Sequence, residues 1–252
     1  MNPQDTTIQE TDGPGVAQAS EDGRRGFLSR AVVAFGALAG LGVASSMTST
    51  ALGVSPRLRY FRDIPGTGDV KILNYALSLE DLEADLYKQA LMRLTNGGTN
   101  VLGRQIPGLG ISASAPDVEY TREFGRIEVE HRNFIRGTLI SLGGPVIPMF
   151  KYDFGMENLT RKQVVELIYT AERTGVGAYL GAIKLFPRLR YLQVAGSILG
   201  TEARHTAVIA GMLNFLFDQT IQVAPGPNVN NGIDQPINPE DVLAAISPFI
   251  VI

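Results

Sequence analysis

The chain has 252 residues, a net charge of −3 and 44% hydrophobic residues. The weak net charge and the lack of a long basic segment argue against nucleic acid as a main partner. There is no cysteine, so disulfides and lipid attachment through an N-terminal cysteine are excluded.

Residues 1–52 follow the three-part order of an export signal. A polar segment precedes Arg24-Arg25, and an apolar run rich in Ala and Gly follows from Ala31 to Ala44. The run is shorter than the about 20 apolar residues of a membrane helix and suits a signal peptide. Gly23-Arg-Arg-Gly-Phe-Leu-Ser29 resembles the twin-arginine signal, although a flexible tail is the alternative. We expect export to the periplasm or beyond by the twin-arginine machinery, with membrane contact only through an uncleaved signal.

Residues 53–218 are predicted to form one helical domain, and about 200 residues after the signal suffice for a substantial core. Apolar residues recur at helical spacing, for example at Ile72, Tyr75 and Leu79 in the first segment. Thr160 and Asp117 are candidate N-caps for two of the helices. The four predicted helices span about residues 69–94, 117–142, 160–186 and 189–218.

Both histidines of the chain lie three residues after a glutamate, as Glu128 with His131 and Glu202 with His205. Residues at i and i+3 share a helix face, so each pair offers one carboxylate and one imidazole to a common point. Glu130 is turned away from the Glu128 face and is interpreted as a surface or supporting acid. Ordinary surface helices with ion-paired side chains are the alternative interpretation.

Each of the other two helices offers a lone glutamate near its middle, Glu80 in the first and Glu172 in the third. Each is followed seven residues later by a tyrosine, Tyr87 and Tyr179, which two helical turns place on the same face. Glu83 lies one turn from Glu80 and remains an alternative to it, although the spacing to Tyr87 favours Glu80.

The order Glu, Glu-x-x-His, Glu, Glu-x-x-His across residues 70–217, together with Leu77-Ser-Leu-Glu-Asp-Leu-Glu-Ala-Asp-Leu-Tyr87, resembles the ferritin-like superfamily. More narrowly, it is similar to exported, desiccation-related ferritin-like proteins. The resemblance implies an all-α, ferritin-like four-helix bundle whose second and third helices are parallel. Their link, residues 143–159, is then a long crossover. Residues 219–252 are expected to form an irregular, Pro- and Asn-rich C-terminal extension with one short helix, docked on the bundle or on a second subunit.

The resemblance also implies two divalent metal ions, and ligand chemistry favours iron or manganese. Glu80 and Glu172 would be terminal ligands, Glu128 and Glu202 would bridge the ions, and His131 and His205 would each bind one ion. Tyr87 and Tyr179 would donate hydrogen bonds or pass electrons, or would simply be core aromatics.

We expect a di-metal protein that reacts with dioxygen or peroxide in oxidative or desiccation stress. Its chemistry would be that of a ferroxidase, a peroxidase or a manganese-catalase-like enzyme. The alternative is a non-catalytic extracytoplasmic structural or stress-binding protein that acts through residues 220–252. The sequence leaves the oligomeric state open, and a homo-oligomer is possible.

Overall fold

The computed structural model describes Leu58, residues 60–223 and residues 232–251. The predicted export signal lies outside this part of the chain. Four long helices form the bundle, and three single-turn helices (η1 Phe61–Asp63, η2 Met156–Asn158 and η3 Ser247–Phe249), a two-stranded hairpin (β1 Gly98–Thr99, β2 Gln105–Ile106) and a short helix surround it. The long helices are α2 Gly68–Leu94, α3 Pro116–Ser141, α4 Arg161–Ile183 and α5 Leu189–Phe217, and the short helix is α6 Pro239–Ile246.

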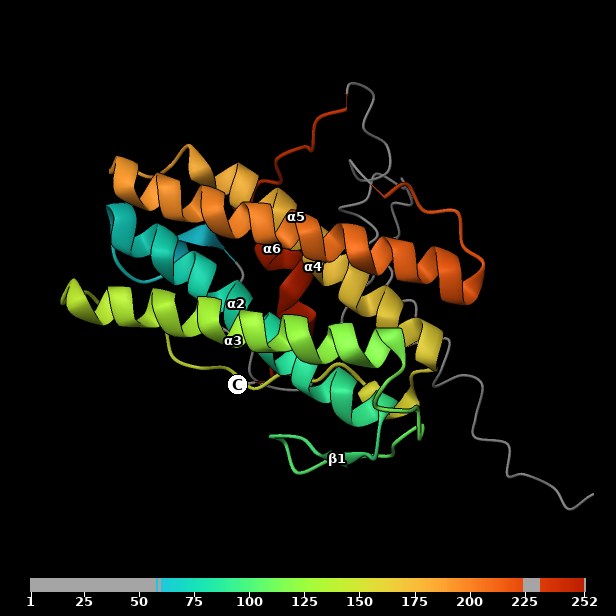
Figure 1. The fold of residues 1–252 in the computed structure, drawn as a ribbon. Helices are drawn as coiled ribbons and strands as arrows, with labels where there is room; N and C mark the ends of the chain where they lie inside the picture. The colour runs from blue at the N-terminus through green and yellow to red at the C-terminus, as the bar shows by residue number, and fades with distance from the viewer. Residues whose placement is uncertain (1–57, 59, 224–231, 252) are drawn as a thin grey trace, which may run out of the picture.

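The long helices form two hairpins, α2 with α3 and α4 with α5 (Figure 1). The chain after α3 runs back along the bundle before it enters α4, so α3 and α4 are parallel (Figure 1). The predicted all-α bundle with a long crossover is therefore confirmed. Among the described residues, no helix is both long and apolar enough to cross a membrane.

The predicted helix ends are partly right. Thr160 caps α4, since its hydroxyl accepts a hydrogen bond from the Gln163 N–H and the Gln163 side chain bonds back to Thr160. Asp117 does not cap α3, because the N-cap is Ala115. The buried Asp117 carboxylate instead accepts two hydrogen bonds, each 2.7 Å long, from the Arg161 guanidinium. α4 also ends before Phe186, because the residue that precedes Pro187 is disfavoured in helical conformation.

The C-terminal segment docks on the bundle. The Ile237 N–H donates to the Gly177 carbonyl of α4 at 2.8 Å, and Tyr152 of the crossover pairs with Ile250. A Cβ atom at Gly177 or Gly181 would overlap Ile237, so these two glycines make room for the segment on α4. The apolar C-terminus therefore completes the core of its own bundle.

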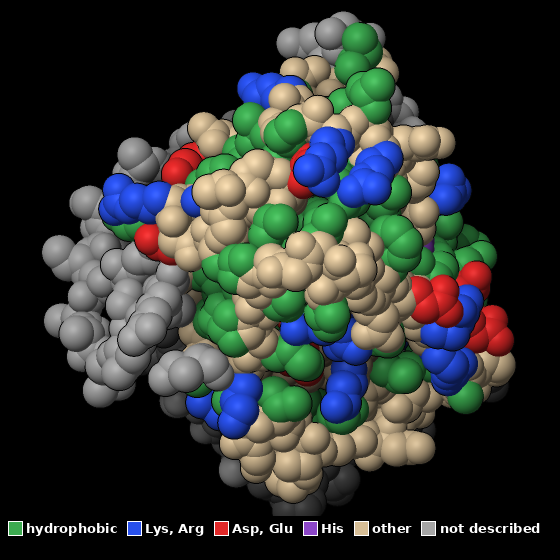
Figure 2. Space-filling model, turned by 90° about the vertical axis from the view of Figure 1, so that its left-hand side faces the viewer, with side chains coloured by type: hydrophobic (Ala, Val, Ile, Leu, Met, Phe, Trp, Pro, Cys, Tyr) green, Lys and Arg blue, Asp and Glu red, His purple; other side chains and the backbone are tan. Residues whose placement is uncertain are grey.

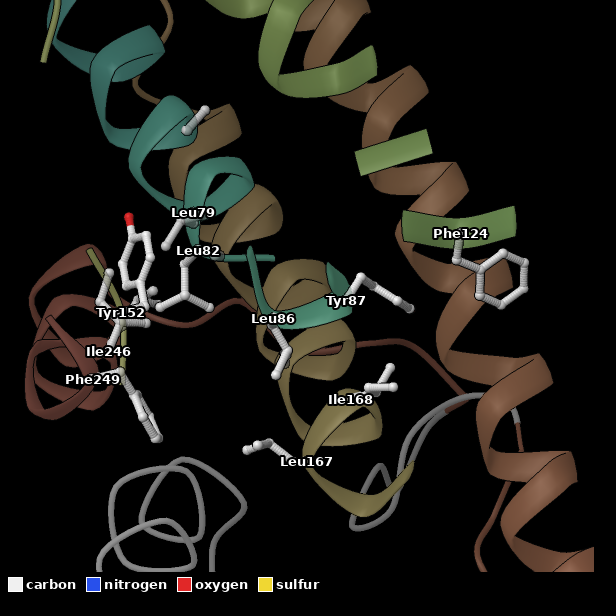
Figure 3. Packing of buried hydrophobic residues seen from close by; sticks show 14 of the residues in the cluster. Leu79, Leu82, Leu86, Tyr87, Phe124, Tyr152, Leu167, Ile168, Ile246 and Phe249 are labelled. Carbon is white, nitrogen blue, oxygen red and sulfur yellow. The ribbon is translucent and has the colours of Figure 1, made fainter. Parts of the chain in front are cut away.

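One hydrophobic core runs through the bundle and under the C-terminal segment. Figure 3 shows Ile246 and Phe249 of that segment beside Leu79, Leu82 and Tyr152. The surface is more mixed. On the bundle end seen in Figure 2, Lys and Arg side chains are scattered among hydrophobic and uncharged groups, without a continuous charged patch in that view.

Candidate metal centre

The six candidate ligands come from all four long helices and meet inside the bundle. Their ligand atoms form two groups, and within each group these atoms lie within 4.8 Å of one another. The two groups share two carboxylates. One group consists of Glu80, Glu128, His131 and Glu202, and the other of Glu128, Glu172, Glu202 and His205.

The position of each ligand on its helix explains this convergence. Each of the four glutamates lies near the middle of its helix. Helix hairpins bring their middles to one level, so four buried carboxylates occupy one layer, each with no exposed surface. The histidines add their rings to the same layer, because i+3 spacing keeps them on the face of their own glutamate.

His131 is surrounded by carboxylates and is the most exposed of the six, with 14% of its side-chain surface accessible. Its Nδ1 atom lies 3.0 Å from Glu128, 3.3 Å from Glu80 and 3.5 Å from Glu202. These three carboxylates are the other members of its group.

His205 is the corresponding residue of the second group and is almost fully buried. Its Nδ1 atom lies 2.9 Å from Glu128 and 3.3 Å from Glu172. Its ring stacks on Phe124 of α3 at a centroid distance of 4.0 Å, which fixes the plane of the imidazole. The sequence analysis did not single out Phe124, although its position four residues before Glu128 places both on one helix face.

The two tyrosines bond across the bundle, and not along their own helices. The Tyr87 hydroxyl donates to Glu172, and the Tyr179 hydroxyl donates to Glu80. Each hydroxyl therefore reaches the carboxylate of the helix that packs opposite it.

Many polar atoms in this layer lack a well-directed hydrogen bond from the described residues. They include both carboxylate oxygens of Glu202, both ring nitrogens of His205, and one oxygen each of Glu80, Glu128 and Glu172. Buried polar atoms without partners are costly and rare. Since carboxylates and imidazoles are ligands of divalent metals such as iron and manganese, the donor set fits two such ions.

The pKa values show how costly the charges are without a metal. Burial, reinforced by Glu202, raises the pKa of Glu128 to about 7. The pKa of Glu202 is raised well above its ordinary value by burial and then by Glu172. Burial lowers the pKa of His131, but hydrogen bonds with Glu128 and its neighbours outweigh this and raise it to about 12. The site therefore holds excess protons that divalent cations would replace.

Glu83 is a further buried acid beside the layer, with 3% of its surface exposed. Burial raises the pKa of Glu83 well above its ordinary value, and Glu202 raises it further. Glu83 belongs to neither group of ligand atoms, whereas Glu80 belongs to one. A Cβ atom at Gly175 of α4 would lie 2.8 Å from a Glu202 oxygen and 3.2 Å from a Glu83 oxygen. Glycine at this position therefore makes room for both carboxylates.

Glu130 lies outside the site, exposed and paired with Arg126.

No curated protein matches the chain. The profile of the ferritin-like domain matches residues 68–214, which is more than half of the chain and includes all four bundle helices nearly in full. The desiccation-related subgroup remains an expectation. Together with the bundle and its carboxylate and histidine layer, this match shows that the chain belongs to the ferritin-like domain family.

Proposed function

We propose that this protein is an exported di-metal oxidoreductase that holds two iron or manganese ions and reacts with dioxygen or peroxide. The observation that carries the proposal is the pair of overlapping ligand groups that share Glu128 and Glu202. Two ions held by these shared carboxylates would be close enough to act on one substrate molecule. The proposed biological setting is oxidative or desiccation stress.

In this proposal Glu80 and Glu172 would each hold one ion, Glu128 and Glu202 would be shared by both ions, and each histidine would bind one ion through a ring nitrogen. When bound, the ion pair supplies a centre that can exchange two electrons with an oxidant. Four protein side chains around each ion, shared ones included, leave positions for water or substrate.

The residues around the ligands prepare the site for this chemistry. The hydroxyls of Tyr87 and Tyr179 donate to Glu172 and Glu80, which orients these carboxylates. The stacked Phe124 holds the His205 ring. The apolar core excludes bulk water from the layer, while the partial exposure of His131 marks the side on which small molecules enter.

The test is metal analysis of the exported protein beside the Glu128→Ala/Glu202→Ala variant, with Glu130→Ala as the control on the same helix. We expect about two iron or manganese ions per chain in the wild type and in the control, and a loss in the double variant. The metal-loaded protein is then assayed for oxygen uptake with Fe(II) and for loss of hydrogen peroxide.

Folded wild-type protein without metal would contradict the di-metal proposal. If the protein binds metal but does not react with oxygen, peroxide or Fe(II), the metal centre is supported and the redox function is contradicted. The alternative is a non-catalytic protein that acts through its C-terminal tail. The structure offers little support for it, because α6 and the C-terminus pack on α4 and on the crossover.

A further inference from the structure

A groove outside the metal layer opens beside Tyr87. Its walls come from α2, α3, the loop of the β1–β2 hairpin and the crossover, which lie together in the lower part of Figure 1. Its volume is about 660 Å³, within the range of small-molecule sites. Its size and its several walls point to a binding site for a compact ligand.

The polar lining of the groove is mainly cationic. Five basic side chains face two acids there, and one of the acids, Asp81, already pairs with Arg136 at 2.8 Å. The excess is local, because the whole chain has a net charge of −3. The basic residues are Lys88, Arg122, Arg126, Arg132 and Lys151, and the acids are Asp81 and Asp85.

Two of these cations have no carboxylate partner among the residues that the structure describes. Arg122 contacts the Ala113 carbonyl at 3.4 Å but no carboxylate among the described residues, and the Lys151 ammonium has no ion pair within them. Arg126 and Arg132, by contrast, have acidic neighbours in Glu130 and Asp81. Arg122 belongs to α3 and Lys151 to the crossover, so two different elements bring these cations to the groove.

The remaining lining is apolar. Leu91, Val129, Met149 and Phe150 contribute to it, and Met149 is 61% exposed at the rim. We propose that the groove binds a small organic anion with an apolar body, whose acidic group is held by Arg122 and Lys151. Tyr87 lines the same groove and donates to Glu172, so the ligand is one side chain away from the carboxylate layer.

The test uses the fluorescent probe 8-anilinonaphthalene-1-sulfonate with the full-length protein, and N-phenyl-1-naphthylamine as the same skeleton without the sulfonate. We expect saturable binding of one sulfonate probe per chain and binding of the uncharged probe that is at least about tenfold weaker, since charge-assisted hydrogen bonds are strong. Arg122→Gln/Lys151→Gln should weaken sulfonate binding by about tenfold or more.

The control Lys162→Gln/Arg204→Gln removes the same charge from α4 and α5, away from the groove, and should change binding by less than about twofold. Equal binding by the wild type and the groove variant, equal binding of both probes, or no binding would overturn the proposal. The Glu128→Gln/Glu202→Gln variant should still bind the probe. A result that contradicts anion binding in the groove can therefore be distinguished from a result that contradicts the metal centre.

Discussion

Without metal, Glu128 should destabilise the protein at neutral and alkaline pH, and Glu128→Gln should relieve this. The Glu128 carboxylate is buried with no exposed surface, and its pKa is raised from 4.5 to about 7 by burial and by Glu202. Glutamine has nearly the same shape and no charge. The substitution therefore removes the unfavourable charge and leaves the packing almost unchanged.

The sign and size follow from linkage between protonation and folding. A carboxyl whose pKa is raised on folding stabilises the native state at pH values below its ordinary pKa, and this contribution is lost as the pH rises to about 7. Each pKa unit corresponds to about 1.4 kcal/mol, so the loss approaches about 3 kcal/mol at pH 8. Metal-free Glu128→Gln should be more stable than the wild type by up to that amount at pH 8. Near pH 4, where the Glu128 carboxyl is mostly protonated in both states, the difference should be small.

Metal should reverse the order. A ligand at one hundred times its dissociation constant stabilises a native state by about 2.7 kcal/mol, and Glu128 is shared by both ligand groups. Mn(II) should therefore raise the free energy of unfolding of the wild type and have little effect on Glu128→Gln.

Urea unfolding followed by circular dichroism, with EDTA or with excess Mn(II), measures both effects, and Glu130→Gln is the exposed control on the same helix. The reasoning is refuted if Glu128→Gln is less stable than the wild type in EDTA at pH 8. It is also refuted if the difference between the two proteins does not change with pH.

Tyr179→Phe removes the hydroxyl that donates to Glu80 and should weaken metal binding by about 10- to 100-fold. Competition with a chelating dye measures the metal affinity. An unchanged affinity would show that this hydrogen bond does not support Glu80 as a ligand. Gly181→Ala places a methyl group against the Ile237 carbonyl and should lower the free energy of unfolding by about 1–3 kcal/mol. Gly211→Ala, in a helix where the new methyl meets nothing within 4 Å, should instead raise it by up to about 1 kcal/mol. Urea unfolding separates the two substitutions, and equal effects would contradict the docking of the C-terminal segment on α4.

The sequence alone was enough to predict the helices and the candidate ligands on them. Helix periodicity is local, so the apolar spacing predicted four long helices close to their actual ends. The i, i+3 spacing of Glu128 with His131 and of Glu202 with His205 likewise predicted which side chains share a face, because that depends on the helix repeat only. Of the two acids that the first helix offers, Glu80 belongs to one of the ligand groups and Glu83 to neither.

Contacts between helices could not be predicted from the sequence, because the rotation of each helix and its position along the bundle depend on how the whole core packs. Packing across the bundle, and not spacing along a helix, pairs Tyr87 with Glu172 and Tyr179 with Glu80. It pairs Asp117 with Arg161, where a local cap was expected. The tertiary structure also decided that Ile237 lies on the glycines of α4 and that a cationic groove opens beside Tyr87, since both combine segments far apart in the chain.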